Sequence, residues 1–322
     1  MKYVQTVRGP VAVDRLGFSL MHEHVMASGA GIQENYPQFY RPDHMEWLIN
    51  DLKACKSNGI NTIVDTSTFD LGRDPKRVKK AAEAADMNII SSTGFFFEMS
   101  PALGSWSEKE IAQMFIDDVT KGMAGTEIKA GLIKAIMDME GPTPGRRLLH
   151  HASGIASNET GVPVYMHTNP LFETARYQIA LLKEVGVPVH RMKLDHILET
   201  TDMDYIKWVY DQGVWIGAER MPRVTTPNDP YAVYVTARIK TFKAMIDAGM
   251  ADRMLIGHDF SAVTPVFDRL SPEERKTFDQ QIPGRWLYWK NTVFPKLLDM
   301  GVDEIVLNKI AIDNPRRFFE GC

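Results

Sequence analysis

The sequence is poor in cysteine, has no excess of basic residues and contains no long apolar run. Cys55 and Cys322 are the only cysteines in 322 residues, so neither a disulfide framework nor a Cys-x-x-Cys metal pair is available. With 37 Lys and Arg against 41 Asp and Glu, the net charge of -4 creates no field that would attract nucleic acid or an anionic membrane surface. No stretch reaches the roughly 20 apolar residues of a membrane span, and residues 1–10 lack the features of a signal peptide. The sequence therefore predicts a cytoplasmic protein with no nucleic-acid or membrane partner.

Two common catalytic motifs are missing as well. There is no G-x-S-x-G elbow to present a serine nucleophile and no glycine-rich loop to hold a phosphate group. Cys55 lies in a helical pattern, where a small buried apolar side chain is the expected role rather than a nucleophile. A different kind of chemistry has to be sought in the residues that are present.

Short apolar runs rich in β-branched and aromatic residues alternate along the chain with longer segments of helical periodicity. Eight such runs predict strands: Phe18–Met21, Asn61–Val64, Asn88–Ile90, Gly131–Ile133, Val162–Met166, Arg191–Leu194, Val214–Ile216 and Met254–Ile256. Helices are predicted at His44–Lys56, Asp74–Ala85, Glu108–Lys121, Gly145–Ser157, Thr174–Glu184, Asp202–Gln212 and Tyr234–Ala248. Several helical segments are followed by a glycine that can end the last turn: Gly59, Gly186, Gly213 and Gly249.

Eight strand-helix alternations without a compositional break predict one α/β domain over residues 1–322, a (β/α)8 TIM barrel. A doubly wound sheet with a second domain fits this regular alternation less well. The segment 260–291 has weak periodicity, three prolines and several aromatics. We expect it to form an active-site lid loop with a short helix of its own.

Polar residues follow the apolar runs at the strand ends, where the reacting groups of such barrels stand. His22 and His24 flank Glu23 after the first run, and alternation along a strand places both imidazoles on one side. His167, His196 and Asp259 each follow a later run directly. Taken singly, each could be a hydrogen-bonded core histidine or a capping aspartate. Together they would be hard to bury without a cation, so the sequence predicts a metal site.

Lys134 ends the fourth run, where an ammonium group, which has no lone pair, cannot bind a metal. Reaction of the amine with carbon dioxide would give an anionic carbamate with two oxygens able to bridge two cations. The alternative is a structural salt bridge from Lys134 to Asp259 or Asp138. With the carbamate, Asp259 and a bridging hydroxide, two divalent ions keep a net positive charge that would hold hydroxide near neutral pH.

With these residues, the chain resembles the phosphotriesterases and phosphotriesterase-like lactonases of the amidohydrolase superfamily. The resemblance covers nearly the whole chain and is strongest in four motifs: Thr6-Val-Arg-Gly-Pro10, Gly17-Phe-Ser-Leu-Met-His-Glu-His24, Thr62-Ile-Val-Asp-Thr-Ser-Thr-Phe-Asp70 and Asp313-Asn-Pro-Arg-Arg-Phe318. It implies that His22, His24 and Asp259 hold a more buried ion, and that His167 and His196 hold a more exposed one. Carboxylated Lys134 and a hydroxide would bridge the two ions.

The resemblance also implies catalytic roles and cofactors. The bridging hydroxide would attack a carbonyl or phosphoryl centre polarised by the exposed ion, while Asp259 takes up or relays a proton. Zinc is the default metal, although cobalt, manganese or iron suit the same histidine and carboxylate ligands. The family resemblance also suggests a homodimer.

The residues predicted to bind substrate agree fully with neither branch of the family. Phe96 stands where lactonases usually carry tyrosine and phosphotriesterases tryptophan, whereas Arg220 looks like the lactonase arginine. Glu199 stands where phosphotriesterases have a proton-relay aspartate, so either a relay from Asp259 through Arg220 to Glu199 or a surface salt bridge could result. Further aromatics indicate an apolar pocket or core packing, and we expect Phe97, Phe260 and Trp286 to join Phe96 and Arg220 in binding substrate.

The function predicted is hydrolysis of a lactone or carboxylic ester by a binuclear metal centre, with organophosphate triester hydrolysis as a side activity. One alternative makes phosphotriester hydrolysis, the aryldialkylphosphatase reaction, the main activity. Another is a barrel that binds a ligand without chemistry and uses the histidines as polar core.

Overall fold

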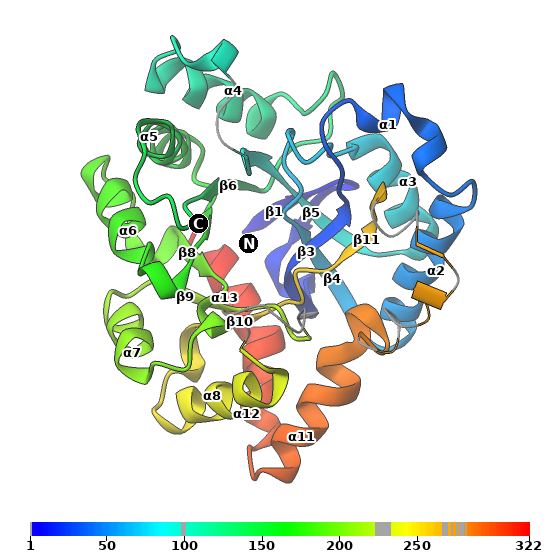
Figure 1. Ribbon diagram of the computed structural model, residues 1–322, viewed down its shortest axis with the longest axis vertical. Coiled ribbons are helices and arrows are strands. Elements are labelled where there is room, and N and C mark those ends of the chain that lie inside the picture. Colours follow the sequence, from blue (N-terminus) through cyan, green and yellow to red (C-terminus); the bar gives the residue numbers. More distant parts are fainter. Residues whose placement is uncertain are drawn as a thin grey trace.

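The eight predicted strands form a closed barrel with helices around it (Figure 1). The computed structural model of the chain describes residues 2–97, 101–222, 233–265, 270–271, 273–274, 276, 280 and 282–322. The barrel strands are β3 (Phe18–Met26), β4 (Ile60–Asp65), β5 (Asn88–Gly94), β6 (Leu132–Ile136), β7 (Val164–His167), β8 (Met192–Asp195), β9 (Trp215–Ala218) and β10 (Met254–Ile256). Each overlaps one predicted run, and neighbours in sequence pair in parallel.

The barrel closes through an eighth strand that is divided in two. On one side β10 pairs with β9, with Ile256 opposite Ala218. On the other side a short ninth strand, β11 (Ser261–Val263), pairs with β3, with Ser261 opposite His24. Residues 257–260 lie between the two halves, where the Asp259 amide donates to the His22 carbonyl at 3.0 Å. The predicted (β/α)8 barrel is confirmed, and the division places Asp259 against the first strand.

The seven predicted helices are present: α2 (His44–Ser57), α3 (Pro75–Ala85), α4 (Glu108–Thr120), α5 (Pro144–Thr160), α6 (Ala175–Glu184), α7 (Met203–Asp211) and α8 (Val235–Asp247). Ser107 and Glu110 form a reciprocal capping box at the start of α4, which satisfies two amides that a helix start leaves without a partner. Gly59, Gly186, Gly213 and Gly249 have φ angles of 77°, 80°, 83° and 79°. This left-handed conformation is the one predicted for residues that follow a helix.

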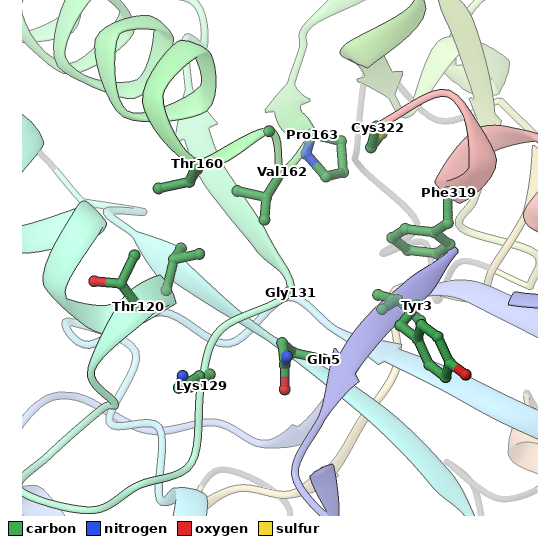
Figure 2. A pocket seen from close by; sticks show the side chains of 13 residues that line it. Tyr3, Gln5, Thr120, Lys129, Gly131, Thr160, Val162, Pro163, Phe319 and Cys322 are labelled. Carbon is green, nitrogen blue, oxygen red and sulfur yellow. The ribbon is translucent and has the colours of Figure 1, made fainter. Parts of the chain in front are cut away.

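The floor of the barrel is built from the two ends of the described chain, which the sequence patterns did not predict. The hairpin β1 (Tyr3–Thr6) and β2 (Gly9–Ala12) lies there beside α13 (Asn314–Glu320). A hollow of about 430 Å³ opens at this end, with Tyr3, Gln5, Lys129 and Phe319 on its walls (Figure 2). None of the six predicted metal ligands is among the described residues that line this hollow.

The predicted lid segment 260–291 is described only in part. Its start forms β11, and its end forms a 3₁₀ turn, Arg285–Leu287, that leads through the π-helical turn Trp289–Val293 into α11 (Phe294–Asp299). Residues 266–269, 272, 275, 277–279 and 281 lie outside the described residues, so the short helix expected within 260–291 stays a prediction. Among the helices that are described, none has both the length and the hydropathy of a membrane span.

Candidate metal centre

The first two predicted ligands project from β3, which is buried along its whole length. His22 and His24 face the barrel interior, while Glu23 between them faces the other way and accepts from the His258 amide at 2.8 Å. Gly257 lets the eighth strand come close here, because a Cβ at this position would lie 2.7 Å from the His22 carbonyl oxygen. The alternation expected from the His-x-His pattern therefore holds.

Three neighbouring strands end in a residue with a left-handed backbone. His196 after β8, Arg220 after β9 and Asp259 after β10 have φ angles of 66°, 60° and 57°. None is a glycine, and a side chain in this region costs roughly 1–3 kcal/mol that surrounding contacts must offset. Such strain gathers at functional sites, and here it turns three polar side chains inward at one level of the barrel.

His22, His24 and Asp259 form the first part of the site. Nε2 of His22 lies 3.3 Å from Oδ1 of Asp259, and Nε2 of His24 lies 3.2 Å from the same oxygen. Nδ1 of His24 lies 3.1 Å from the Ser67 hydroxyl, so it is Nε2, which also lies 3.4 Å from the Thr66 hydroxyl, that faces the carboxylate. Two imidazole nitrogens and one carboxylate oxygen thus meet at a single point.

His167 and His196 form the second part. Nδ1 of His167, at the end of β7, lies 3.0 Å from Nε2 of His196, which lies 3.9 Å from Oδ2 of Asp259. The rings of His22 and His196 are 4.9 Å apart, so the two parts adjoin. Burial lowers the pKa values of His167 and His196 well below the usual value, which keeps both imidazoles neutral and able to donate a lone pair.

Lys134 lies on β6 inside the barrel and has no exposed surface. Its Nζ donates to Asp195, the residue directly before His196, and not to Asp259 or Asp138 as the salt-bridge alternative proposed. Burial lowers the pKa of Lys134, although Asp195 opposes the shift. A lowered pKa favours the neutral amine, which is the form that reacts with carbon dioxide.

The residues present suit a cation. In the described part of the chain, both ring nitrogens of His22 and Nδ1 of His196 are buried without a hydrogen-bond partner of good geometry. Burial and Lys134 both lower the pKa of His22, yet contacts with Asp195 and Asp259 outweigh them and raise it. A positive charge is therefore favoured at this point, and neutral imidazoles with a carboxylate form a ligand set typical of zinc.

Asp259 is also held from the side of the barrel mouth. Nε of Arg220 donates to Oδ2 of Asp259 at 2.8 Å, and Nη1 of Arg220 donates to Glu199. Although burial raises the pKa of Asp259, Arg220 and His196 hold it well below the usual range. Because a guanidinium keeps its protons in proteins, Arg220 joins Asp259 and Glu199 as a fixed charge. Glu199 is buried, so the pair is not a surface salt bridge.

Phe96 and Phe97 stand beside the second part of the site. The Phe96 ring lies 5.5 Å from the His167 ring, and the Phe97 side chain is half exposed. Asp70 accepts from both backbone amides, at 2.9 Å and 2.6 Å, and Nη1 of Arg146 donates to both carbonyls, at 3.4 Å and 3.1 Å. All four polar backbone groups of this pair are thus bound, which fixes an apolar wall next to His167.

Two residues predicted to bind substrate lie elsewhere. Phe260 and Trp286 are buried and pack edge to face, 6.0 Å apart. Nε1 of Trp286 donates to Oε2 of Glu23 at 3.0 Å, behind the strand that carries His22 and His24. The structure therefore places both rings behind the predicted ligands and not beside Phe96. Hydrophobicity alone gave no signal for which side of the strand they would occupy.

Three buried charged residues lie together beneath the predicted ligands, and the sequence patterns did not predict that they would meet. They are Lys193 and Asp195 on β8 and Glu219 after β9, each without exposed surface. None of the three was among the predicted site residues. The available signal was that charged residues occur within or directly after apolar runs.

Comparison with known proteins points to one family over nearly the whole chain. A model of the phosphotriesterase family matches residues 2–319. The chain belongs to the phosphotriesterase family. A phosphotriesterase homology protein of Mycobacterium tuberculosis is 31% identical, over 99% of this chain and 98% of its own length. An aryldialkylphosphatase of Saccharolobus solfataricus is also 31% identical, over 94% of this chain and 95% of its own. The human N-acetyltaurine hydrolase is 25% identical, over 98% and 97%.

Membership of the phosphotriesterase family supports a metal-dependent hydrolase. Two groups within the described residues have the spacing for an ion: His22, His24 and Asp259 in one, and His22, His196 and Glu219 in the other. The family includes relatives named for phosphate esters and for an acylated amine, so membership leaves the bond that is cleaved open.

Proposed function

We propose that this protein is a binuclear metal hydrolase that cleaves a lactone or carboxylic ester, with organophosphate triesters as side substrates. The observation that carries the proposal is the meeting of His22, His24 and Asp259 at one point, within 3.3 Å, beside His167 and His196. We assign the ions to these five side chains and to a carbamate on Lys134, with zinc as the default metal.

When bound, a pair of divalent ions makes water nucleophilic near neutral pH and polarises the oxygen of the bond to be cleaved. The protein's own groups supply the rest. Asp259, held anionic by Arg220, is placed to take up a proton at Oδ1 or Oδ2 as water is consumed. Phe96 and Phe97 present apolar surface beside His167, which suits the acyl chain or aryl group of an ester.

Arg220 is the residue that resembles the lactonase arginine, and this resemblance is our reason for preferring a carbonyl substrate. Its guanidinium stands at the mouth, where it can donate toward a lactone or ester oxygen. The aryldialkylphosphatase relative is the observation in favour of the second candidate, phosphotriester hydrolysis as the main activity. A panel of lactones, aryl esters and triesters, run on protein with a defined metal content, separates the two. A kcat/KM for triesters far above that for lactones would overturn our preference, and turnover of no substrate by protein with two ions would favour a non-catalytic barrel.

The variant Lys134→Ala tests the carbamate. It should lose most activity and the paired ions, and a short carboxylate added to the buffer should restore part of both. Asp259→Asn, which can still offer an oxygen but cannot take up a proton, should lower kcat while keeping at least one ion. Unchanged metal content in Lys134→Ala, or full activity in Asp259→Asn, would contradict the respective role.

A further inference from the structure

Lys193 is a fully buried lysine in the barrel interior, one layer below the predicted ligands. Its Nζ donates to Asp195 and to Glu219, and it lies 4.7 Å above the ring of Tyr165. Within the described residues no hydrogen bond or ion pair joins Lys193 to any of the six predicted metal ligands. A buried lysine normally costs several kcal/mol unless its partners return that energy, so the side chain needs an explanation.

The first partner, Asp195, reaches the first part of the metal centre. Its Oδ2 lies 3.2 Å from Nδ1 of His22 and also accepts from Nζ of Lys134. With Nδ1 directed at a carboxylate, the Nε2 of His22 is directed at Asp259. Histidines that bind metals usually turn their second nitrogen to such a carboxylate, which fixes the ring and its tautomer.

The second partner, Glu219, reaches the second part. Its Oε2 accepts from the backbone amide of His196 at 2.6 Å and lies 3.6 Å from Nδ1 of the same residue. This contact holds the left-handed backbone of His196. Gly217 makes the conformation of Glu219 possible, because a Cβ at position 217 would lie 2.1 Å from Oε1 of Glu219.

Both carboxylates are fully buried, and they are neighbours with the same charge. Asp195 and Glu219 would repel each other and turn apart unless a cation held them, since the interior screens charge poorly. Lys193 touches one oxygen of each, Oδ1 of Asp195 and Oε1 of Glu219, and leaves the other oxygens to the histidines. One ammonium group thus sets the positions of two carboxylates. Asp195 faces His22, and Glu219 contacts His196 through Oε2 while its Oε1 also lies 4.0 Å from Nδ1 of His22.

We propose that Lys193 is a positioning residue for both halves of the metal centre, acting through Asp195 on His22 and through Glu219 on His196. The inference rests on the proposed function for the identity of the ligands. It predicts that one lysine, which touches neither ion nor substrate, controls the affinity for both ions.

The test is the metal affinity of Lys193→Met, which keeps the length of the side chain and removes its charge. Zinc binding by the full chain is titrated, and the visible spectrum of the cobalt-loaded protein reports the geometry at each ion. We expect both ions to bind roughly 10–100-fold more weakly, with a changed cobalt spectrum. Tyr165→Phe is the matched control, because it perturbs the same layer but touches neither carboxylate, and it should keep the affinity and spectrum of the unaltered protein.

The result that overturns the inference is a Lys193→Met protein that binds both ions within twofold of the unaltered affinity and has the same cobalt spectrum. Weakening of only one ion would overturn the claim that Lys193 serves both halves. A double-mutant cycle adds a test of the route: if Lys193 acts on His196 through Glu219, Lys193→Met and Glu219→Gln should be less than additive at that ion. Full additivity would exclude this route.

If Lys193→Met does not fold, the isosteric variants Asp195→Asn and Glu219→Gln replace it. Asp195→Asn should weaken mainly the ion at His22, and Glu219→Gln mainly the ion at His196, and unchanged affinity in both overturns the inference. The proposed function fails separately. Unaltered protein that binds two ions but hydrolyses nothing in the substrate panel refutes the hydrolase and leaves the role of Lys193 standing, whereas unaltered protein that binds no ions refutes both.

Discussion

Replacing Glu23 by glutamine should destabilise the protein far more than the loss of one charge suggests. Both oxygens of Glu23 accept two hydrogen bonds each. Oε1 accepts from the amide and from Nδ1 of His258, at 2.8 Å and 2.7 Å, and Oε2 accepts from the Phe260 amide at 3.1 Å and from Trp286 Nε1 at 3.0 Å. Nε2 of His258 accepts from the Trp289 amide at 3.2 Å, so its Nδ1 must carry the proton.

A glutamine at position 23 would therefore set its NH2 group against two buried N–H donors, whichever way the amide turns. Each hydrogen bond to a charged group contributes about 1.5–3 kcal/mol, so the loss of two should cost roughly 3–6 kcal/mol of the free energy of unfolding. The loss also loosens the turn 257–260, which carries Asp259. Zinc affinity should fall together with stability.

Urea unfolding followed by tryptophan fluorescence, together with zinc titration, would measure both effects. Glu127→Gln, an exposed glutamate at the surface, serves as the control and should change stability by less than about 0.5 kcal/mol. If Glu23→Gln unfolds at the same urea concentration as this control, the four hydrogen bonds do not stabilise the barrel as argued.

Three further perturbations test other parts of the structure. Burial lowers the pKa of His150 to about 4, against 6.5 for an unperturbed histidine, so between these values the unfolded chain binds more protons than the folded one. The free energy of unfolding should therefore fall by about 3 kcal/mol as the pH drops from 6.5 to 4. The variant His150→Asn should lose less over the same pH range, and an equal loss in both proteins would refute the argument. Arg146→Met frees the Phe96 and Phe97 carbonyls and should raise KM for aryl esters about fivefold with little change in kcat, and an equal fall in kcat would count against a binding role. A chelator that removes the metal should lower the free energy of unfolding by about 4 kcal/mol per site, compared with protein in the presence of free ion at 1,000 times Kd. Thermal unfolding would measure this difference, and an unchanged midpoint would argue against bound ions.

The barrel could be predicted because short apolar runs alternate regularly with long helical segments, and several of those helices end at a glycine. The hairpin β1–β2 was missed because Tyr3–Thr6 and Gly9–Ala12 contain no continuous apolar run and no helical segment separates them, so they do not repeat the pattern that marked the other strands. The division of the eighth strand was missed for a different reason. Aspartate is enriched in the left-handed region but seldom adopts it, so the residue type of Asp259 does not by itself predict its φ of 57°.

The predicted ligands could be found because strand ends of a barrel meet at one level, so position in the sequence implies proximity in space. No such rule applies to interior layers. Lys193 falls within a predicted strand and Glu219 follows another, and only the closed barrel brings their charges together. Likewise, Trp286 looked like a pocket residue because the sequence does not indicate which face of the first strand it would cover.

The left-handed residues at three consecutive strand ends limit how the mouth of this barrel can be redesigned. In a library that randomises positions 196, 220 and 259, many variants would fail because the new side chain cannot adopt the native backbone, whatever its chemistry. β-Branched side chains in particular strongly resist positive φ angles. Asparagine, aspartate, histidine and glycine are the substitutions that should survive there. New activities are therefore more accessible at positions 96 and 97, which have no positive φ, since Phe96 lies beside His167 and Phe97 is half exposed.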